Sequence, residues 1–140
     1  MEFSNLDKND YHTYKNLINS NITQEYFENF LYNILNENHI IIVLKKDNNI
    51  IGSGTILIEN KLTYNGCKMG HIENIIIDEK YRKQGYGEEL VKYLLKICND
   101  RKCYRVDLNC NSELENFYKK NNFNKKHICM NIYFKENFII

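Results

Sequence analysis

The sequence has no proline, no long apolar run and almost no net charge. The absence of proline, beside many Asn, Lys, Ile and Tyr residues, indicates a coding bias that weakens arguments from surface composition. Lys and Arg number 19 and Asp and Glu number 18 in 140 residues, a net charge of +1. A nucleic-acid partner is therefore not expected, and any anion site must be local. The longest apolar runs, 40–44 and 75–77, are too short to span a bilayer, and residues 1–5 lack the basic start of a secretory signal.

Cysteine is present, but not in a pattern that holds a metal. The five cysteines are an odd number, and no two are spaced as C-x-x-C. A zinc site needs paired ligands at short spacing, and a disulfide-rich secreted domain usually has an even number. We therefore expect reduced thiols in a cytoplasmic protein, and no metal. The cysteines are Cys67, Cys98, Cys103, Cys110 and Cys129.

No linker, repeat or low-complexity segment divides the chain, so one domain over residues 1–140 is predicted. A turn at 47–49 indicates a hairpin, and Gly52 and Gly54 indicate a bulge or a close backbone approach. Ser112 and Glu115 resemble a capping box. Hydrophobic periodicity predicts helices over 6–18, 23–35 and 88–99, and a short helix that opens at the Ser112 cap and stops near 121–122. It predicts strands over 40–46, 50–58, 70–77, 105–110 and 128–134.

The order of these elements predicts an α+β fold. A strand–helix–strand crossover over 70–110 favours one parallel pair within a largely antiparallel sheet that is flanked by helices.

The segment 82–87, Arg-Lys-Gln-Gly-Tyr-Gly, lies between a predicted strand and a predicted helix. Gly85 and Gly87 permit positive φ and a close approach of a ligand to the backbone. The following helix directs unpaired N–H groups and the positive end of its dipole at the loop, so the pattern favours a phosphate. No Gly-Lys-Ser/Thr follows, which excludes a Walker loop. An ordinary turn with solvated Arg82 and Lys83 is the alternative.

The block from Ile75 to Gly87 resembles the acetyl-CoA signature of the GNAT superfamily, and 116–123, Asn-Phe-Tyr-Lys-Lys-Asn-Asn-Phe, is similar to its second signature. The resemblance implies acetyl-CoA as cosubstrate. In that superfamily the strand before the loop contacts the pantetheine arm and the loop amides hold the pyrophosphate. The implied cofactor-binding residues are Ile75, Ile76, Ile77, Arg82, Lys83, Gln84, Gly85, Tyr86, Gly87, Glu88 and Tyr118.

A narrower resemblance is carried by 70–75, Gly-His-Ile-Glu-Asn-Ile, and by 102–110. These segments resemble those of the glucosamine 6-phosphate N-acetyltransferases, and the similarity of the chain to that family extends over roughly residues 40 to 134. That family implies acetyl transfer by direct attack in a ternary complex to the 2-amino group of glucosamine 6-phosphate, towards UDP-N-acetylglucosamine. It also implies a homodimer in which 128–134 packs against the partner.

Acetyl transfer needs a neutral amine, a stabilised oxyanion and a proton for the leaving thiolate. The resemblance implies Tyr118 as the proton donor and Glu73 in the amino-sugar pocket; a core aromatic and an outward-facing carboxylate are the alternatives. Asn109, near which a water relay from backbone carbonyls could serve as the base, completes the catalytic candidates. The substrate-binding candidates are Lys61, Glu73, Asn74, Asn109 and Tyr133.

Some positions depart from the family pattern. Asn74 and Asn109 stand where carboxylates are usual, and Tyr133 stands where some relatives have an arginine that binds phosphate. Lys61 is the candidate to replace that arginine, and a solvated lysine is the alternative. His71 is either a structural residue or the base.

Two other functions remain open on the sequence alone. One is a GNAT enzyme that acetylates another amine, such as a protein amino terminus, a lysine or a polyamine. The other is a non-catalytic acyl-CoA-binding module.

Overall fold

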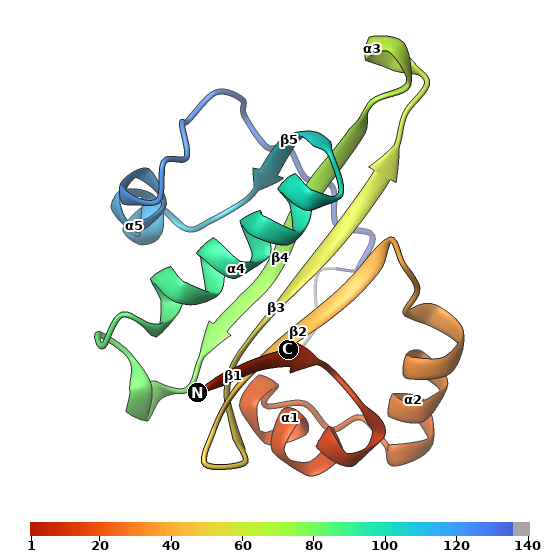
Figure 1. Cartoon of the computed structure of the whole chain (residues 1–140), viewed down its shortest axis with the longest axis vertical. Coiled ribbons are helices and arrows are strands. Elements are labelled where there is room, and N and C mark those ends of the chain that lie inside the picture. Colours follow the sequence, from red (N-terminus) through yellow and green to blue (C-terminus); the bar gives the residue numbers. More distant parts are fainter. Residues whose placement is uncertain (136–140) are drawn as a thin grey trace. The chain divides into compact units, whose positions relative to one another are not determined.

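A computed structural model describes residues 1–135 and divides the chain into two compact units, residues 1–108 and the residues from Asn109 onward. The first unit holds a five-stranded sheet with its helices, and the second holds one short helix (Figure 1). The strands are β1 (Glu2–Asn5), β2 (His39–Lys46), β3 (Asn49–Asn60), β4 (Lys68–Ile77) and β5 (Cys103–Leu108). The α-helices are α1 (Tyr11–Ile18), α2 (Gln24–Asn29), α3 (Thr63–Gly66), α4 (Tyr86–Asp100) and α5 (Glu115–Lys120).

The sheet has the order β1-β2-β3-β4-β5. The first three junctions are antiparallel, and β4 and β5 are parallel. Helix α4 makes the crossover between β4 and β5, as the sequence predicts. The predicted α+β class with a mixed, mostly antiparallel sheet is confirmed.

The predicted hairpin is formed by β2 and β3. Lys46 pairs with Asn49, so only Asp47 and Asn48 make the turn, with φ of 53° and 65°. Two consecutive positive φ values match the right-handed twist of a hairpin, and Asp and Asn tolerate them better than most residues.

Close approach explains the two glycines of β3, as predicted. A Cβ at Gly52 would lie 2.7 Å from Ile77 Cδ1, and one at Gly54 would lie 2.6 Å from Leu94 Cδ1. The pairing register of β3 with β4 also shifts between Ser53 and Thr55. Small residues therefore let α4 and the end of β4 sit tightly against β3.

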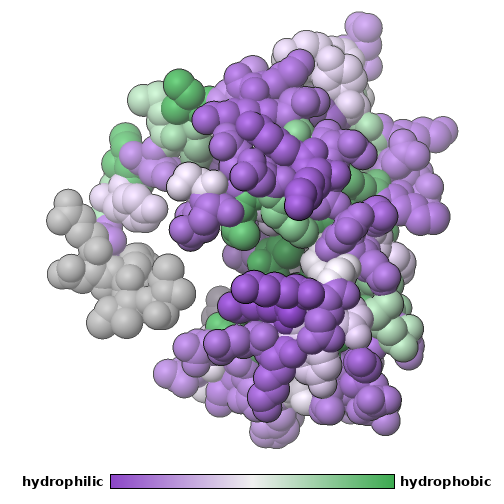
Figure 2. Space-filling model, turned by 90° about the vertical axis from the view of Figure 1, so that its left-hand side faces the viewer, coloured by the Kyte–Doolittle hydropathy of each residue, from purple (hydrophilic) through white to green (hydrophobic). Residues whose placement is uncertain are grey.

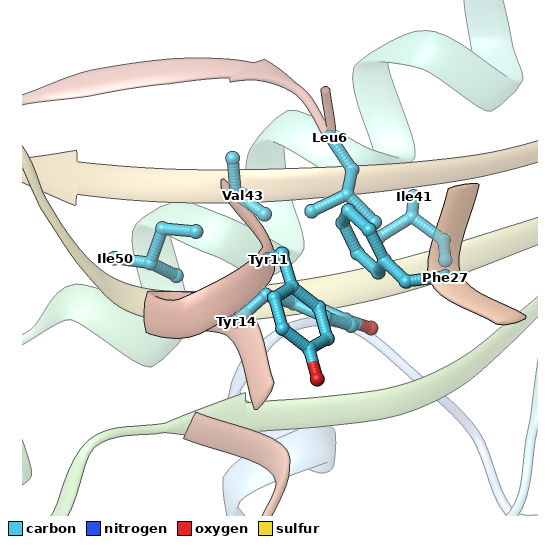
Figure 3. Close-up of a cluster of buried hydrophobic side chains, with 7 residues drawn as sticks. All are labelled: Leu6, Tyr11, Tyr14, Phe27, Ile41, Val43 and Ile50. Atoms are coloured by element: carbon cyan, nitrogen blue, oxygen red, sulfur yellow. The ribbon is translucent and has the colours of Figure 1, made fainter. Parts of the chain in front are cut away.

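Each face of the sheet in the first unit has its own core. Leu90, Val91 and Leu94 of α4 are fully buried on one face. The other face carries a cluster from α1, α2 and the strands (Figure 3). Its members are Leu6, Tyr11, Tyr14, Phe27, Ile41, Val43 and Ile50.

Several boundaries differ from those predicted. Helix α1 begins at Tyr11, after a 3-10 turn that Asp7 caps. Helix α2 ends at Asn29 and continues as a π-helical turn, η2 (Phe30–Ile34). The predicted Ser112 cap is wrong, because Asn111 precedes the 3-10 turn Ser112–Leu114 and no side-chain cap hydrogen bond forms.

One strand was missed and one was wrong. Strand β1 was missed because its four residues are too few for a clear alternation. It packs on α4 through Phe3, whose ring stacks on that of Tyr93 with centroids 4.3 Å apart. Residues 128–134 form no strand in the described chain, although apolar residues alternate there. A strand needs a hydrogen-bonding neighbour, and alternation does not supply one.

The surface is mostly hydrophilic on the face drawn in Figure 2, where hydrophobic residues form smaller groups. Across residues 1–135, no helix combines the length and the apolar character that crossing a membrane requires.

Candidate active site

The end of β4 is open along one edge. The ladder between β4 and β5 stops at the pair Ile72 and Leu108, whereas β4 continues to Ile77. On its other side β4 stays paired with β3, where Ser53 faces Ile76. Within the first unit, the backbone of residues 73–77 thus has no strand partner on the β5 side. An extended ligand with amide groups can hydrogen-bond to such an edge.

A bulge marks the start of this open edge. Asn74 has a φ of 53°, and two residues of β4 stand opposite Gly54 alone. Glu73 and Asn74 are exposed, and the three isoleucines 75–77 are only half-buried although they lie in an inner strand. These half-exposed isoleucines, beside backbone groups without a strand partner, could bind a ligand that is partly apolar.

The loop after β4 leads into α4 with the geometry of an anion site. Lys83 and Gly85 have φ of 62° and 88°, and Gly85 is the N-cap of α4, with no side-chain cap hydrogen bond. The first N–H groups of this 15-residue helix therefore lack both an intrahelical partner and a cap. They point out at the positive end of the helix dipole, where a phosphate is favoured.

Two side chains of this loop fold back on the turn before it. Arg82 Nε donates to the Ile77 carbonyl oxygen at 3.0 Å, and Gln84 Nε2 donates to the Lys80 carbonyl oxygen at 3.2 Å. Both side chains shape the loop through these bonds, and the backbone N–H groups at the start of α4 are donors to a ligand. Glu88, also predicted to bind the cofactor, pairs with Lys92 at 3.1 Å.

Three polar side chains meet at the end of β3: Glu59 of β3, His71 of β4 and Lys61, which follows β3. Gly70 faces Cys98 of α4, so His71 points the other way, and Glu73 shares the face of His71. Glu59 accepts a hydrogen bond from His71 at 3.1 Å and forms an ion pair with Lys61 at 3.3 Å. These two contacts hold the pKa of Glu59 below its usual value. Lys61 is thus engaged by a carboxylate.

The contact of His71 Nε2 with Glu59 fixes the orientation of the imidazole ring. Glu59 itself was not singled out in the sequence. The hairpin between β3 and β4 could have revealed it, since the register places Glu59 opposite Met69, beside the pair of Leu57 and His71.

Tyr118 lies on α5 in the second unit. It is buried, and its ring packs edge to face against Phe117 and Phe123, with centroids 5.0 Å and 5.8 Å away. Burial raises the pKa of Tyr118, so the phenol keeps its proton at neutral pH. A protonated phenol can donate to a developing thiolate.

The other two candidates of the second unit are open to solvent. Asn109, its first residue, is exposed, and the side chain of Tyr133 is 72% exposed. Five predicted positions, Ile75–Ile77, Glu73 and Asn74, share β4. The predicted positions 82–88 follow after the 3-10 turn Glu79–Tyr81 and run into the first turn of α4. The described residues contain no cluster of three or more His, Cys, Asp or Glu side chains suited to a metal.

An open strand edge followed by an uncapped helix N-terminus suits an extended ligand that carries an anionic group. Comparison with known proteins gives the family. The model of the acetyltransferase (GNAT) family matches residues 5–123. The chain therefore belongs to the acetyltransferase (GNAT) family.

Within that family the chain is similar to proteins named glucosamine 6-phosphate N-acetyltransferase. The one from Arabidopsis thaliana is 31% identical over 121 residues, which cover 84% of this chain and 81% of the relative. A probable one from Oryza sativa is 34% identical over 104 residues, covering 71% of this chain and 63% of the relative. The crystal structure of the Arabidopsis enzyme superposes with a TM-score of 0.91 at 28% identity, over 96% of this chain and 98% of that one.

Proposed function

We propose that the chain transfers the acetyl group of acetyl-CoA to the 2-amino group of D-glucosamine 6-phosphate, giving N-acetyl-D-glucosamine 6-phosphate and CoA. The observation that carries the cofactor half is the open edge of β4 leading into the uncapped N-terminus of α4. The acceptor rests on the names of the relatives. Both units are proposed to belong to one catalytic domain, since the family match crosses their boundary.

The cosubstrate site that we propose has two parts in the first unit. The backbone of Ile75–Ile77 hydrogen-bonds the amides of the pantetheine arm, and the side chains of these isoleucines cover its methylene groups. The N–H groups of residues 83–88 hold the pyrophosphate, helped by the dipole of α4. Arg82 and Gln84 keep the loop in shape through their bonds to the preceding turn.

The reaction is a direct displacement at the thioester. The neutral amine attacks the carbonyl carbon, the C–N bond forms, and the C–S bond of the tetrahedral intermediate breaks. The amine nitrogen loses one proton, and the thiolate sulfur of CoA takes one from the phenol of Tyr118. Burial supports this role, because it keeps the phenol protonated at neutral pH.

For the acceptor we propose contacts from polar residues of each unit. Glu73 and Asn74 at the bulge hydrogen-bond the amino sugar, and Asn109 lies near its amine with backbone carbonyls that can hold a water. Lys61 and Tyr133 are the proposed phosphate contacts. The ion pair of Lys61 with Glu59 means that Lys61 must leave or share this carboxylate to bind phosphate.

We also propose a cytoplasmic homodimer that supplies the precursor of UDP-N-acetylglucosamine. The dimer is supported by residues 128–134, whose apolar side chains are 72% to 95% exposed. Burying them against a second copy would remove a large apolar surface from water. Sedimentation of the chain, compared with a variant in which Ile128, Met130 and Ile132 are serine, tests this: the chain should sediment as a dimer and the variant as a monomer.

The decisive assay measures CoA release with glucosamine 6-phosphate, glucosamine and spermidine as acceptors. Turnover with the sugar phosphate well above that with glucosamine supports the proposal. Turnover of spermidine without turnover of the sugar phosphate would make the chain a GNAT enzyme for another amine. CoA binding without turnover of any amine would make it an acyl-CoA-binding module.

A further inference from the structure

Lys46, the last residue of β2, reaches the entrance of α4. Its Nζ donates a hydrogen bond of 3.0 Å to Tyr86 Oη and lies 5.6 Å from the centre of the Tyr86 ring. The same Nζ lies 5.8 Å from the centre of the Tyr81 ring, and the two rings meet edge to face at 6.2 Å. One ammonium group thus joins the residues on the two sides of the loop 82–85.

This loop is in a conformation that needs support. Lys83 has a φ of 62°, a conformation that is strained for a non-glycine residue. The bond of Arg82 ties the loop to the end of β4, and the bond of Gln84 ties it to the preceding 3-10 turn. The bond from Lys46 spans 40 residues and fixes the start of α4 to the β2–β3 hairpin.

The sign of the charge is also informative. A cation beside the N-terminus of a helix is repelled by the helix dipole. The hydrogen bond to Tyr86 nevertheless raises the pKa of Lys46, so the ammonium stays charged at neutral pH. An anion in the loop would offset the repulsion between Lys46 and α4.

We propose that Lys46 is a positioning residue for the cosubstrate, which acts through Tyr86 and Tyr81 to hold the loop ready for pyrophosphate. The proposal rests on the acetyl-CoA site proposed above and adds to it a residue outside the loop. Lys46 makes two cation–π contacts and one hydrogen bond at this place. Losing all three should weaken CoA binding about tenfold.

The test is calorimetric titration of the full chain with CoA, in the absence of any acceptor. Lys46→Met should raise the Kd about tenfold, whereas Lys46→Arg, which keeps a cation and a donor, should stay within about twofold. Lys96→Met is the matched control, because it removes an exposed lysine of α4 that pairs with Asp100 at 2.7 Å. It should bind CoA as the wild type does. In turnover, Lys46→Met should raise the KM for acetyl-CoA and leave kcat unchanged.

A double-mutant cycle with Tyr86→Phe shows whether Lys46 acts through the ring residue. The double variant should bind little worse than Lys46→Met alone, because the two residues form one unit. Losses that multiply would overturn the proposal and make Lys46 a direct ligand of the cofactor. Wild-type affinity in Lys46→Met would also overturn it. If the wild type bound no CoA, the proposed function itself would fail. Should Lys46→Met not fold, Lys46→Gln takes its place.

Discussion

The substitution Gly85→Ala isolates the backbone of the proposed pyrophosphate loop. Gly85 has a φ of 88°, and a Cβ there would meet no atom within 4 Å. The cost is therefore conformational only, about 1–2 kcal/mol for an L-residue in the left-handed region. The loop is exposed, so we expect the alanine to relax it in the free protein and the cost to reappear on binding. The Kd for CoA should rise about 5- to 30-fold.

Gly66→Ala is the matched control. Gly66 has a φ of 77°, and its nearest neighbour would be the Lys61 carbonyl oxygen at 3.8 Å. The backbone cost is the same. This turn has no proposed contact with the cosubstrate, because Lys61 is proposed for the acceptor phosphate, so the Kd for CoA should not change. Calorimetric titration of both variants, with thermal unfolding as a check of folding, gives the comparison. Wild-type affinity in Gly85→Ala, or an equal loss in Gly66→Ala, would refute the reasoning.

Three further predictions use other parts of the chain. Tyr118→Phe should lower kcat about 10²-fold or more, as loss of a general acid does, with the Kd for acetyl-CoA nearly unchanged; an unaltered kcat removes Tyr118 from the mechanism. Burial raises the pKa of Tyr118, so kcat should not fall through deprotonation of Tyr118 below about pH 10. A fall of kcat near neutral pH that is absent in Tyr118→Phe would contradict this. Glu59→Gln should flatten the acid dependence of stability: the lowered pKa of Glu59 stabilises the fold above the usual carboxyl pKa, and that stabilisation is lost as pH falls through the lowered value. Urea unfolding at about pH 6 and about pH 3 measures this, and parallel losses in variant and wild type would refute it.

Long, periodic segments of the fold were predictable from the sequence. Helix α4 has apolar residues at helical spacing. The turn at Asp47 and Asn48 indicates that the two strands beside it, β2 and β3, form a hairpin. Strand β1 was not predictable, because it pairs with the distant strand β2 and its four residues carry no pattern that indicates this pairing. The strand expected at 128–134 was wrong for a related reason. The alternating pattern shows which side chains would share one face of a strand, but it does not show which strand would pair with it.

The candidate site divides in the same way. The loop 82–87 was predictable because its glycines and basic residues are neighbours in the sequence, and a turn that binds an anion requires such residues locally. The open edge of β4 depends on where its ladder with β5 stops, at Ile72, which only the register shows. Glu59 and Lys46 were missed because each meets its partner across the sheet or across 40 residues. Nothing next to them in the chain signals those contacts.

The most direct test of the site is amide hydrogen exchange of the chain with and without acetyl-CoA. Binding should slow exchange at two places, Ile75–Ile77 on the open edge of β4 and residues 86–88 at the start of α4. Exchange in β1, at the other edge of the sheet, should stay as it is. Acetyl-CoA that binds without protecting either β4 or the start of α4 would contradict the proposed site.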